Sequence, residues 1–350
     1  MALSVVLPNF NHGHLIGHAL DAMAAQGRPP DEIIVVDDAS TDASLEILEP
    51  YCKSLPQLTV LRNEHTLGAV GALQRGLEAA TKRYVYFAAA DDWVLPGFFE
   101  TAVAILDAYP DCGLVCGESM VLSGETGKFL GYRPAVRPSF RGGRITPEMG
   151  RRLLKKADNF LLTGSAVFRR DSVMEKGGFD ERAGSFADGL LIRKIALTSG
   201  FFFEPRIFAV WNVFSEGLSR TTALDIERAR KALDLLPLLI EQDADFPEWY
   251  SAVFRRRWRF GAARLAIEAR PARIPLLVEF GAISPWDKWF LSIMASGIAY
   301  CPVRWLIVAF LATRLRPYRL RDVVATAAVR RMMLLNAKRR PASGAQRDFP

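Results

Sequence analysis

The sequence predicts a doubly wound α/β domain followed by a helical extension. Short apolar runs alternate with amphipathic helical patterns in the first third of the chain, which is typical of a mainly parallel sheet with helices on both faces. Polar residues follow three of those runs, and open α/β sheets bind ligands beyond the carboxyl ends of their strands. Strand patterns nearly vanish after residue 222, so we expect one domain over 1–222 and a helical region over 223–340.

The first third alternates regularly between strand and helix patterns. Apolar runs predict strands at residues 3–8, 31–38, 58–63 and 84–89. Helical patterns lie at residues 14–26, from about 43 onward, at 68–80 and at 96–108. We expect Ser40 or Thr41 to cap the second helix and Pro96 to occupy the first turn of the fourth. Because crossovers between parallel strands are right-handed, this alternation predicts a Rossmann-like sheet.

The segment from 110 to 222 is less regular. The run "CGLVCGESMVLS" predicts a further strand, and residues 134–147, rich in Pro, Arg and Gly, predict a loop. We expect a strand leading into a helix within "NFLLTGSAVFRRDSV", and another helix from about Phe186. The run "FFFEPRIFAVWN" predicts either a strand pair or one bent strand.

Composition indicates a well-packed protein of one large or two ordinary domains. The chain has 350 residues, of which 50% are hydrophobic and 24% charged, as expected for a real core. Its four cysteines lack metal-ligand or redox spacing, so we expect reduced thiols and a cytosolic location. The chain opens directly on the strand-like "LSVVLP", so we expect no signal peptide.

An apolar strand in "YVYFAAADDW" runs directly into Asp91 and Asp92. Such a pair forms either a turn before a helix or a site for a cation. The polar stretches "PNFN" and "DDAS" end two other predicted strands, and this convergence favours a ligand site. Neither G-x-G-x-x-G after the first strand nor G-x-x-x-x-G-K-[ST] is present, so dinucleotide and P-loop sites are disfavoured.

The motifs "SVVLPNFNHGHLIGHALDAM", "IIVVDDASTDAS", "YVYFAAADDWVLP", "GSAVFRRD" and "GGFDE" followed by "AD", in this order, resemble the family 2 glycosyltransferases with the GT-A fold. The resemblance covers roughly residues 2–220. It implies an inverting glycosyltransferase that moves a sugar from a UDP- or dTDP-linked donor to a hydroxyl of a glycan, which we expect to be carried on a lipid. It also implies Mg²⁺ or Mn²⁺, which would offset charge on the donor diphosphate.

The resemblance implies that Asp92 binds the metal. It implies that Asp91 contacts either the donor ribose or the same metal. Many relatives carry Asp-x-Asp-Asp here, whereas Ala89 stands at the first position of this chain. Many also place a His where Phe214 stands, so one metal ligand is expected to be missing. We expect Trp93 to pack beneath the loop, and Gly217 and Ser219 to allow the loop to close over the donor.

The family's Glu-Asp pair falls on Ala187 and Asp188, which makes Asp188 the candidate general base for the acceptor hydroxyl. The alternative is that Asp188 only caps a helix. Asp180 and Glu181 are weaker candidates, because they fit a turn after two glycines.

The donor base is expected between the first two strand ends. Asp38 would accept a hydrogen bond from the base, with Pro8 and Phe10 supplying backbone contact and a ring face. Asp37 is expected to be structural. His14 and His18, one helical turn apart, fit a solvated face better than a ligand set.

The net charge of +7 is unevenly placed. Arginines gather in "FRRRWRF" and after residue 313, on both sides of the apolar run 289–313. Nucleic-acid-binding motifs are absent, so an anionic membrane surface is the expected partner. Arg304 and Pro302 interrupt the run, which favours two short interfacial helices over one spanning helix. A packed helical subdomain or a homo-oligomer interface remains open, and residues 341–350 are expected to be disordered.

These patterns place the protein at the cytoplasmic face of the membrane, peripheral or monotopic. A nucleotidyltransferase is a second possibility, but "PNFNHGH" lacks the basic glycine-rich loop expected for it. A decayed nucleotide- or glycan-binding scaffold is a third, because the first acid and the His of the family pattern are missing.

Overall fold

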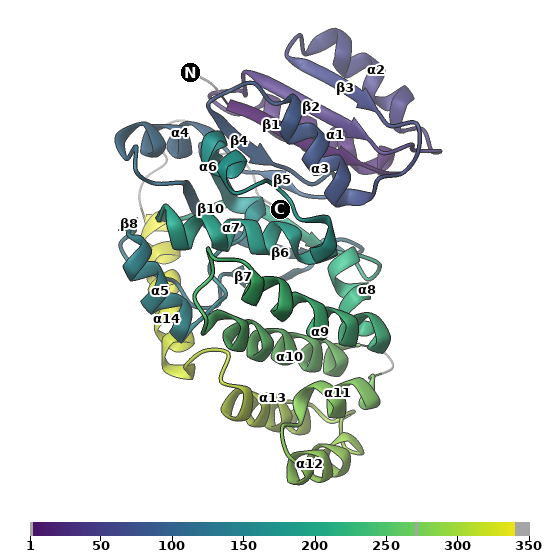
Figure 1. The fold of residues 1–350 in the computed structure, drawn as a ribbon, viewed down its shortest axis with the longest axis vertical. Coiled ribbons are helices and arrows are strands. Elements are labelled where there is room, and N and C mark those ends of the chain that lie inside the picture. The colour runs from purple at the N-terminus through teal and green to yellow at the C-terminus, as the bar shows by residue number, and fades with distance from the viewer. Residues whose placement is uncertain (1–2, 270–271, 340–350) are drawn as a thin grey trace.

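The computed structural model describes residues 3–269 and 272–339, which form a ten-stranded sheet with helices on both faces (Figure 1). The strand order is β3-β2-β1-β4-β9-β6-β10-β5, with β7 paired to β6 and β8 to β10. Four parallel strands, β1 (Leu3–Asn9), β2 (Glu32–Asp37), β3 (Leu58–Arg62) and β4 (Tyr84–Phe87), make up the first half. The predicted mixed α/β architecture is confirmed.

The helices between these strands lie close to their predicted positions. They are α1 (Gly13–Ala24), α2 (Ser44–Ser54), α3 (Gly68–Ala79) and α4 (Phe98–Ala108). The predicted cap of α2 is wrong, because the Asp42 carboxylate accepts the Ser44 N–H instead, at 3.0 Å. The same carboxylate accepts the Gly13 N–H at 3.0 Å, so it joins the starts of α1 and α2. Pro96 also lies outside α4, since Gly97 precedes the helix in a left-handed conformation, with φ of 85°.

The second half of the sheet is mixed in direction. It contains β5 (Trp93–Val94), β6 (Leu114–Ser123), β7 (Phe129–Arg133), β8 (Gly143–Ile145), β9 (Ala166–Arg169) and β10 (Phe201–Val213). Strand β9 runs antiparallel to β4 and β6, whereas β10 is parallel to β6. β10 is one bent strand, with register shifts between Phe203 and Ala209. The loop predicted at 134–147 contains β8, which pairs with Phe201–Phe203 of β10.

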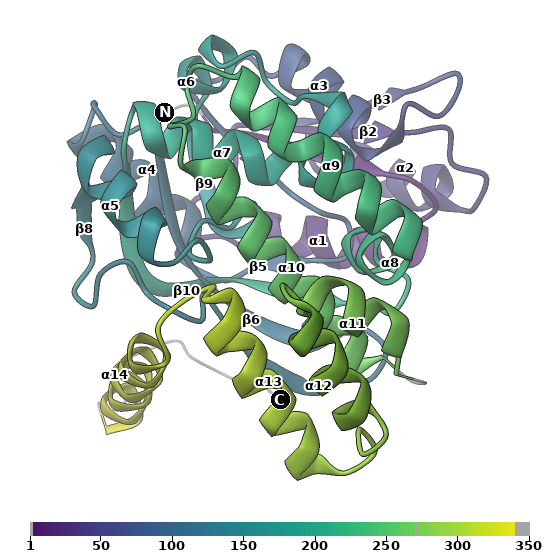
Figure 2. The same ribbon diagram turned by 60° about the horizontal axis from the view of Figure 1, so that its bottom comes forward.

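The remaining segments are helical. Around the second half of the sheet lie α5 (Pro147–Lys156), the short turn η1 (Thr163–Ser165), α6 (Arg170–Glu175), η2 (Glu181–Phe186) and α7 (Ala187–Thr198). The C-terminal region contains α8 (Leu218–Leu224), α9 (Ile226–Gln242), α10 (Tyr250–Glu268), α11 (Ile274–Gly281), α12 (Pro285–Ala295), α13 (Cys301–Leu315) and α14 (Leu320–Arg339). Helix α10 contacts α9, α11 and α13. In Figure 2, α12 and α13 lie next to each other, whereas α14 lies away from both.

The helical region and one face of the sheet share a continuous core. Buried Val6, Phe87 and Phe168 of the strands belong to the same apolar cluster as Phe254 of α10 and Leu311 of α13. A second cluster, which includes buried residues of α1 and α4, covers the other face. Burial of this kind contributes about 25 cal/mol per Å² of apolar surface, so the C-terminal helices stabilise the sheet as well as themselves.

The arginines of "FRRRWRF" do not form the basic surface that the composition predicts. Arg257 pairs with buried Asp158 at 3.2 Å, and Arg259 donates to the Phe280 carbonyl at 3.0 Å. Helix α10 lies inside the helical region, so most of these side chains meet carbonyls and a carboxylate of the protein instead of an external anion.

Helix α14 is held to the sheet by a buried carboxylate. Glu118 of β6 is fully buried and accepts hydrogen bonds from Arg137 at 2.5 and 2.8 Å and from Arg330 of α14 at 2.7 and 3.0 Å. The Thr326 hydroxyl accepts the Arg137 backbone N–H at 3.1 Å. Arg330 therefore neutralises an internal acid and is not part of a lipid-binding surface.

The apolar run 289–313 is divided between α12 and α13, as expected for two short helices. Within the described ranges, no helix combines the length and the apolar character needed to cross a bilayer. Residues 341–350, for which disorder is expected, lie outside the described residues.

Candidate active site

Three predicted strand ends meet at one edge of the sheet because β1, β2 and β4 are parallel neighbours. Asp37, at the end of β2, is fully buried. It accepts the side-chain amide of Asn9 at 3.0 Å and the N–H of Ser40 at 3.1 Å. Asp37 therefore joins the ends of β1 and β2, which is the structural role expected for it.

Asp38 holds the segment that leads from β3 into α3. Its Oδ1 accepts the Asn63 side-chain amide at 2.6 Å and the Leu67 N–H at 2.7 Å. Its Oδ2 accepts the Gly68 N–H at 2.8 Å. The residue is 2% exposed, so the carboxylate is fixed in place at the start of α3, where a negative charge is favoured.

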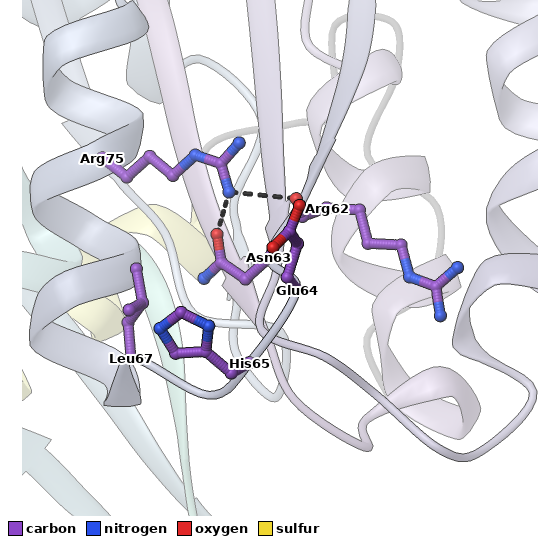
Figure 3. Close-up of a pocket in the computed structure, with 6 residues that line it drawn as sticks. All are labelled: Arg62, Asn63, Glu64, His65, Leu67 and Arg75. Atoms are coloured by element: carbon purple, nitrogen blue, oxygen red, sulfur yellow. Dashed lines mark hydrogen bonds between the residues drawn. The ribbon is translucent and has the colours of Figure 1, made fainter.

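A shallow pocket lies beside Asp38 (Figure 3). It is lined by Arg62, Asn63, Glu64, His65, Leu67 and Arg75. The Arg75 guanidinium reaches from α3 to the Asn63 side chain and to the Arg62 carbonyl. Sequence reasoning missed Asn63 and Arg75. The available signal was that Asn63 is the polar last residue of a predicted strand.

The other predicted contacts of the donor base lie on or just after β1. Pro8 is half-buried within the strand and pairs in register with Val36 of β2. Phe10 follows the strand with its ring 45% exposed, so it offers a free aromatic face at the carboxyl edge.

Asp91 and Asp92 lie in the turn between β4 and β5. Asp92 Oδ1 accepts the Asn212 backbone N–H at 2.7 Å, and the Asn212 side-chain amide donates to the Asp91 carbonyl at 2.7 Å. Sequence reasoning missed Asn212 of β10, which is far away along the chain. Trp93 is half-buried and pairs with Val210 of β10, so the turn is held on its far side by the sheet itself.

The negative charges of Asp91 and Asp92 are destabilised by their surroundings. Burial raises the pKa of Asp92 well above its ordinary value, and the charge of Asp91 raises that pKa further. Burial also raises the pKa of Asp91, although the nearby His12 partly opposes this. A cation beside the pair would relieve both effects.

The pair fits a hard divalent cation that arrives with a diphosphate. In the described part of the chain, no cluster of three or more His, Cys, Asp or Glu side chains is arranged to hold a metal. Phe214, at the position where the family pattern has a His, lies against Gly124. Mg²⁺ commonly uses one or two carboxylates and completes its shell with water and substrate phosphates. Asp91 and Asp92 supply that minimal set.

Asp188 lies in the first turn of α7 and is half-buried. Phe186 occupies the N-cap position of α7 and its side chain makes no capping hydrogen bond. Asp188 lies two residues further on, inside the first turn. Helix α7 contacts η1, and a Cβ atom on Gly164 of η1 would lie 3.9 Å from Asp92 Oδ2. The helix that carries Asp188 therefore adjoins the turn beside the acid pair.

A buried ionic network lies under this end of α7. Asp158 accepts a hydrogen bond from Arg193 of α7 at 2.6 Å and from the Tyr250 hydroxyl at 2.8 Å. Arg257 of α10 pairs with the same carboxylate at 3.2 Å. Arg193 also donates to the Gly189 carbonyl at 2.8 Å, so the network holds the backbone next to Asp188.

The weaker candidates take structural positions. Asp180 pairs with Arg182 at 2.8 Å and accepts the Arg182 N–H at 3.0 Å, as expected for a turn residue. Glu181 is exposed at the start of η2. His14 and His18 are exposed on α1.

Residues 4–177 match the family model described as Glycosyl transferase family 2. The putative teichuronic acid biosynthesis glycosyltransferase TuaG of Bacillus subtilis (strain 168) is 37% identical over 90 residues, which cover 26% of this chain and 36% of that protein. The chain spans 56% or less of the length of the first curated relatives that it matches.

Two solved structures share the fold over nearly the whole chain. S. aureus TarS 1–349 in complex with UDP-GlcNAc has a TM-score of 0.58 at 19% identity, and covers 95% of this chain and 92% of its own. The mannosyltransferase PcManGT from Pyrobaculum calidifontis, in complex with GDP-Man and Mn²⁺, has a TM-score of 0.57 at 22% identity, and covers 93% and 86%. The predicted GT-A-type fold is thereby confirmed. Residues 4–177 of this chain therefore form a glycosyl transferase family 2 segment.

Proposed function

We propose that this chain is a metal-dependent, inverting glycosyltransferase that uses a UDP- or dTDP-sugar and a glycan hydroxyl in the synthesis of a cell-surface polysaccharide. The observation that carries the proposal is the half-buried Asp91–Asp92 pair at the carboxyl end of β4, within the segment that matches family 2. Residues 1–222 would carry out catalysis, and residues 223–340 would associate with the membrane. The similarity to TuaG, named for teichuronic acid biosynthesis, supports a cell-surface polysaccharide.

The donor base would lie at the ends of β1 and β2. Asp38 Oδ2 accepts one hydrogen bond, from Gly68, and a carboxylate oxygen can accept two. The exposed ring of Phe10 would stack on the base and Pro8 would provide backbone contact. Asn63 keeps Asp38 oriented, and UDP-GlcNAc in the structure of TarS supports a uracil nucleotide.

Asp92, with Asp91, would hold Mg²⁺ or Mn²⁺, and the similarity to PcManGT with Mn²⁺ supports this assignment. The bound cation supplies Lewis-acid stabilisation of charge on the leaving diphosphate. The chain itself contributes the orientation of the acids. Asn212 holds Asp92 Oδ1 and leaves Oδ2 without a hydrogen bond from any described residue, so that oxygen is free to face a cation.

Asp92→Asn is expected to abolish metal-dependent binding of donor nucleotide and to leave the fold intact. An amide oxygen still accepts the Asn212 N–H but is a poorer ligand for a hard cation than a carboxylate. Because the pKa of Asp92 is raised in the metal-free protein, its charge costs stability as pH rises through that pKa. Asn should therefore leave metal-free thermal stability near pH 7 unchanged or slightly increased.

Calorimetric titration of UDP with and without Mn²⁺, together with thermal unfolding, measures both effects. Asp171→Asn is the matched control, because Asp171 is an exposed acid on α6. If Asp92→Asn bound UDP with Mn²⁺ as tightly as the parent, the metal assignment would be wrong.

Asp188 would take the proton from the acceptor hydroxyl as that oxygen attacks the anomeric carbon. A single displacement inverts the anomeric centre and requires one base, without a protein nucleophile. The acceptor would be a lipid-linked glycan at the anionic cytoplasmic membrane face.

A decayed scaffold is the second candidate, favoured by Ala89 and by Phe214, which lies against Gly124. Incubation of the protein with a panel of nucleotide sugars and Mn²⁺ separates the two. Release of the nucleoside diphosphate from one donor, lost in Asp92→Asn, supports an enzyme. Donor binding without turnover under any condition supports the scaffold.

A further inference from the structure

Helices α12 and α13 present an aromatic surface to solvent. The exposed fractions are 57% for Trp286, 60% for Trp289, 70% for Tyr300 and 70% for Trp305. Ile283, just before α12, and Ile293, within α12, are 51% and 50% exposed. We call these six residues the aromatic surface. Large aromatic side chains are normally covered in a soluble domain, so such a group marks a contact with another phase or molecule.

Packing holds the aromatic surface outward. Leu291 of α12, together with Ile307 and Leu311 of α13, is fully buried in the core shared with the sheet. Trp286 stacks on Phe290 at 5.4 Å, and Phe290 lies 4.4 Å from Phe310 of α13. The two helices therefore cannot rotate to bury their tryptophans without exposing leucine and isoleucine from the core.

The charge around the aromatic surface is positive. Residues 283–322 contain six basic residues, Lys288, Arg304, Arg314, Arg316, Arg319 and Arg321, and two acids, Asp287 and Asp322. Asp322 pairs with Arg321 at 3.6 Å. Asp287 is fully buried, and its carboxylate is bound by Arg314 at 2.9 and 3.0 Å. Lys288 is exposed between Trp286 and Trp289 along α12. Anionic headgroups attract each such charge by about 1 kcal/mol near a membrane surface.

We propose that the aromatic surface is a monotopic membrane-docking surface, which inserts its tryptophans among the headgroups of an anionic bilayer. Trp and Tyr favour this zone because one end of the ring system is apolar and the other polar. Helix α13 has 15 residues and spans about 22 Å, short of the roughly 30 Å hydrocarbon core. Both helices would therefore lie in the plane of the interface.

A second copy of the chain is a poorer occupant. A two-fold contact through this surface would bring Lys288 and the neighbouring arginines of both copies together. The two acids of residues 283–322 are already paired, because Asp287 is buried against Arg314 and Asp322 contacts Arg321. The aromatic surface would bring the enzyme to a lipid-linked acceptor, and this role rests on the proposed function. Binding to a bilayer requires no catalysis, so membrane docking itself can be tested separately.

Vesicle flotation of the full chain tests the proposal. The parent should float at low salt with phosphatidylcholine vesicles that contain phosphatidylglycerol, and much less with phosphatidylcholine alone. Trp286→Ser/Trp289→Ser/Trp305→Ser should reduce partitioning by more than about tenfold, because the apolar contact is lost. Removal of 286–340 would be a poor test, since it deletes Leu291 and Leu311 and uncovers the remaining core around Phe254 and Phe280.

The matched control is Tyr109→Ser/Met174→Ser, which removes exposed apolar side chains at the end of α4 and on α6, far from α12 (Figures 1 and 2). It should float like the parent. Brominated lipids should quench tryptophan fluorescence in the parent but not in the triple variant. Nucleotide-sugar hydrolysis in solution, without vesicles, should be equal in the parent and the triple variant, which separates loss of docking from failure of the enzyme.

Several results would overturn the proposal. One is a parent protein that does not float with anionic vesicles at low salt. Another is flotation that is equal with neutral vesicles or unaffected by the three substitutions. A concentration-dependent dimer that the triple variant abolishes, without any vesicle binding, would assign the surface to contact between copies.

Discussion

Asp188→Asn is expected to lower turnover by roughly 10²- to 10⁴-fold, the usual contribution of a positioned acid or base, while binding of the donor stays nearly unchanged. The amide cannot take the proton of an attacking hydroxyl at any pH. Among the described residues, none donates a hydrogen bond to the Asp188 side chain, and the helix start is held through Arg193 and Gly189. The substitution therefore removes a proton acceptor without removing a structural bond.

Initial rates with saturating donor and calorimetric titration of UDP with Mn²⁺ test this together. Glu181→Gln, which changes an exposed acid just before α7, is the control and should keep parent rates. Equal losses of binding and turnover in Asp188→Asn would show that the residue supports the fold and is not the base.

Asp158→Asn is expected to lower the free energy of unfolding by about 3–5 kcal/mol, the range measured when one partner of a buried ion pair is removed. Asp158 is 1% exposed and is the carboxylate between Arg193 and Arg257. Without its charge, the Arg193 guanidinium, whose side chain is 3% exposed, stays ionised in the core and loses the carboxylate that it contacts at 2.6 Å. Tyr250 also loses a charged acceptor.

The same variant should change the dependence of stability on pH. Burial alone would raise the pKa of Asp158, but Arg193 and Arg257 outweigh it and hold the pKa below its ordinary value. A lowered folded-state pKa stabilises the protein above the unfolded pKa of about 3.9, and this stabilisation is lost as pH falls through the folded value. The parent should therefore lose this stability below about pH 4, whereas Asp158→Asn lacks it at every pH.

Urea denaturation at pH 7 and at several values below pH 4 measures both parts. Asp171→Asn on α6 is a control for loss of an exposed acid, and should stay within about 0.5 kcal/mol of the parent. A change under about 1 kcal/mol at pH 7 for Asp158→Asn would mean that the two arginines are solvated well enough to need no counter-charge.

Local patterns determined the first half of the sheet. Strands buried on both faces read as continuous apolar runs, so β1 to β4 were predicted within two residues at either end. The sequence also predicted that Asp38 and Asp91–Asp92 lie close together, because neighbouring parallel strands place their carboxyl ends at one edge of the sheet. Strand β8 was not predictable, since its three residues pair with Phe201–Phe203, more than fifty residues away.

The partners of the site residues depended on contacts between distant segments. Asn212 reaches the Asp91–Asp92 turn across 120 residues of sequence, and Asn63 meets Asp38 from another strand. No local periodicity marks an amide for such a role. The cap of α2 was predicted wrongly for the same reason. The Ser40 hydroxyl accepts hydrogen bonds from Asn9 and Asn11, and the Thr41 N–H donates to the Asn11 side chain, so neither residue caps α2.

The sequence by itself determined that this chain forms a GT-A-type sheet with an acidic strand end and a basic, aromatic C-terminal region. The tertiary structure alone decided which arginines face inward. Arg257 and Arg330 neutralise Asp158 and Glu118, whereas Lys288 remains exposed beside Trp289. A buried charge requires an opposite charge at contact distance, and composition counts charges without showing which of them meet.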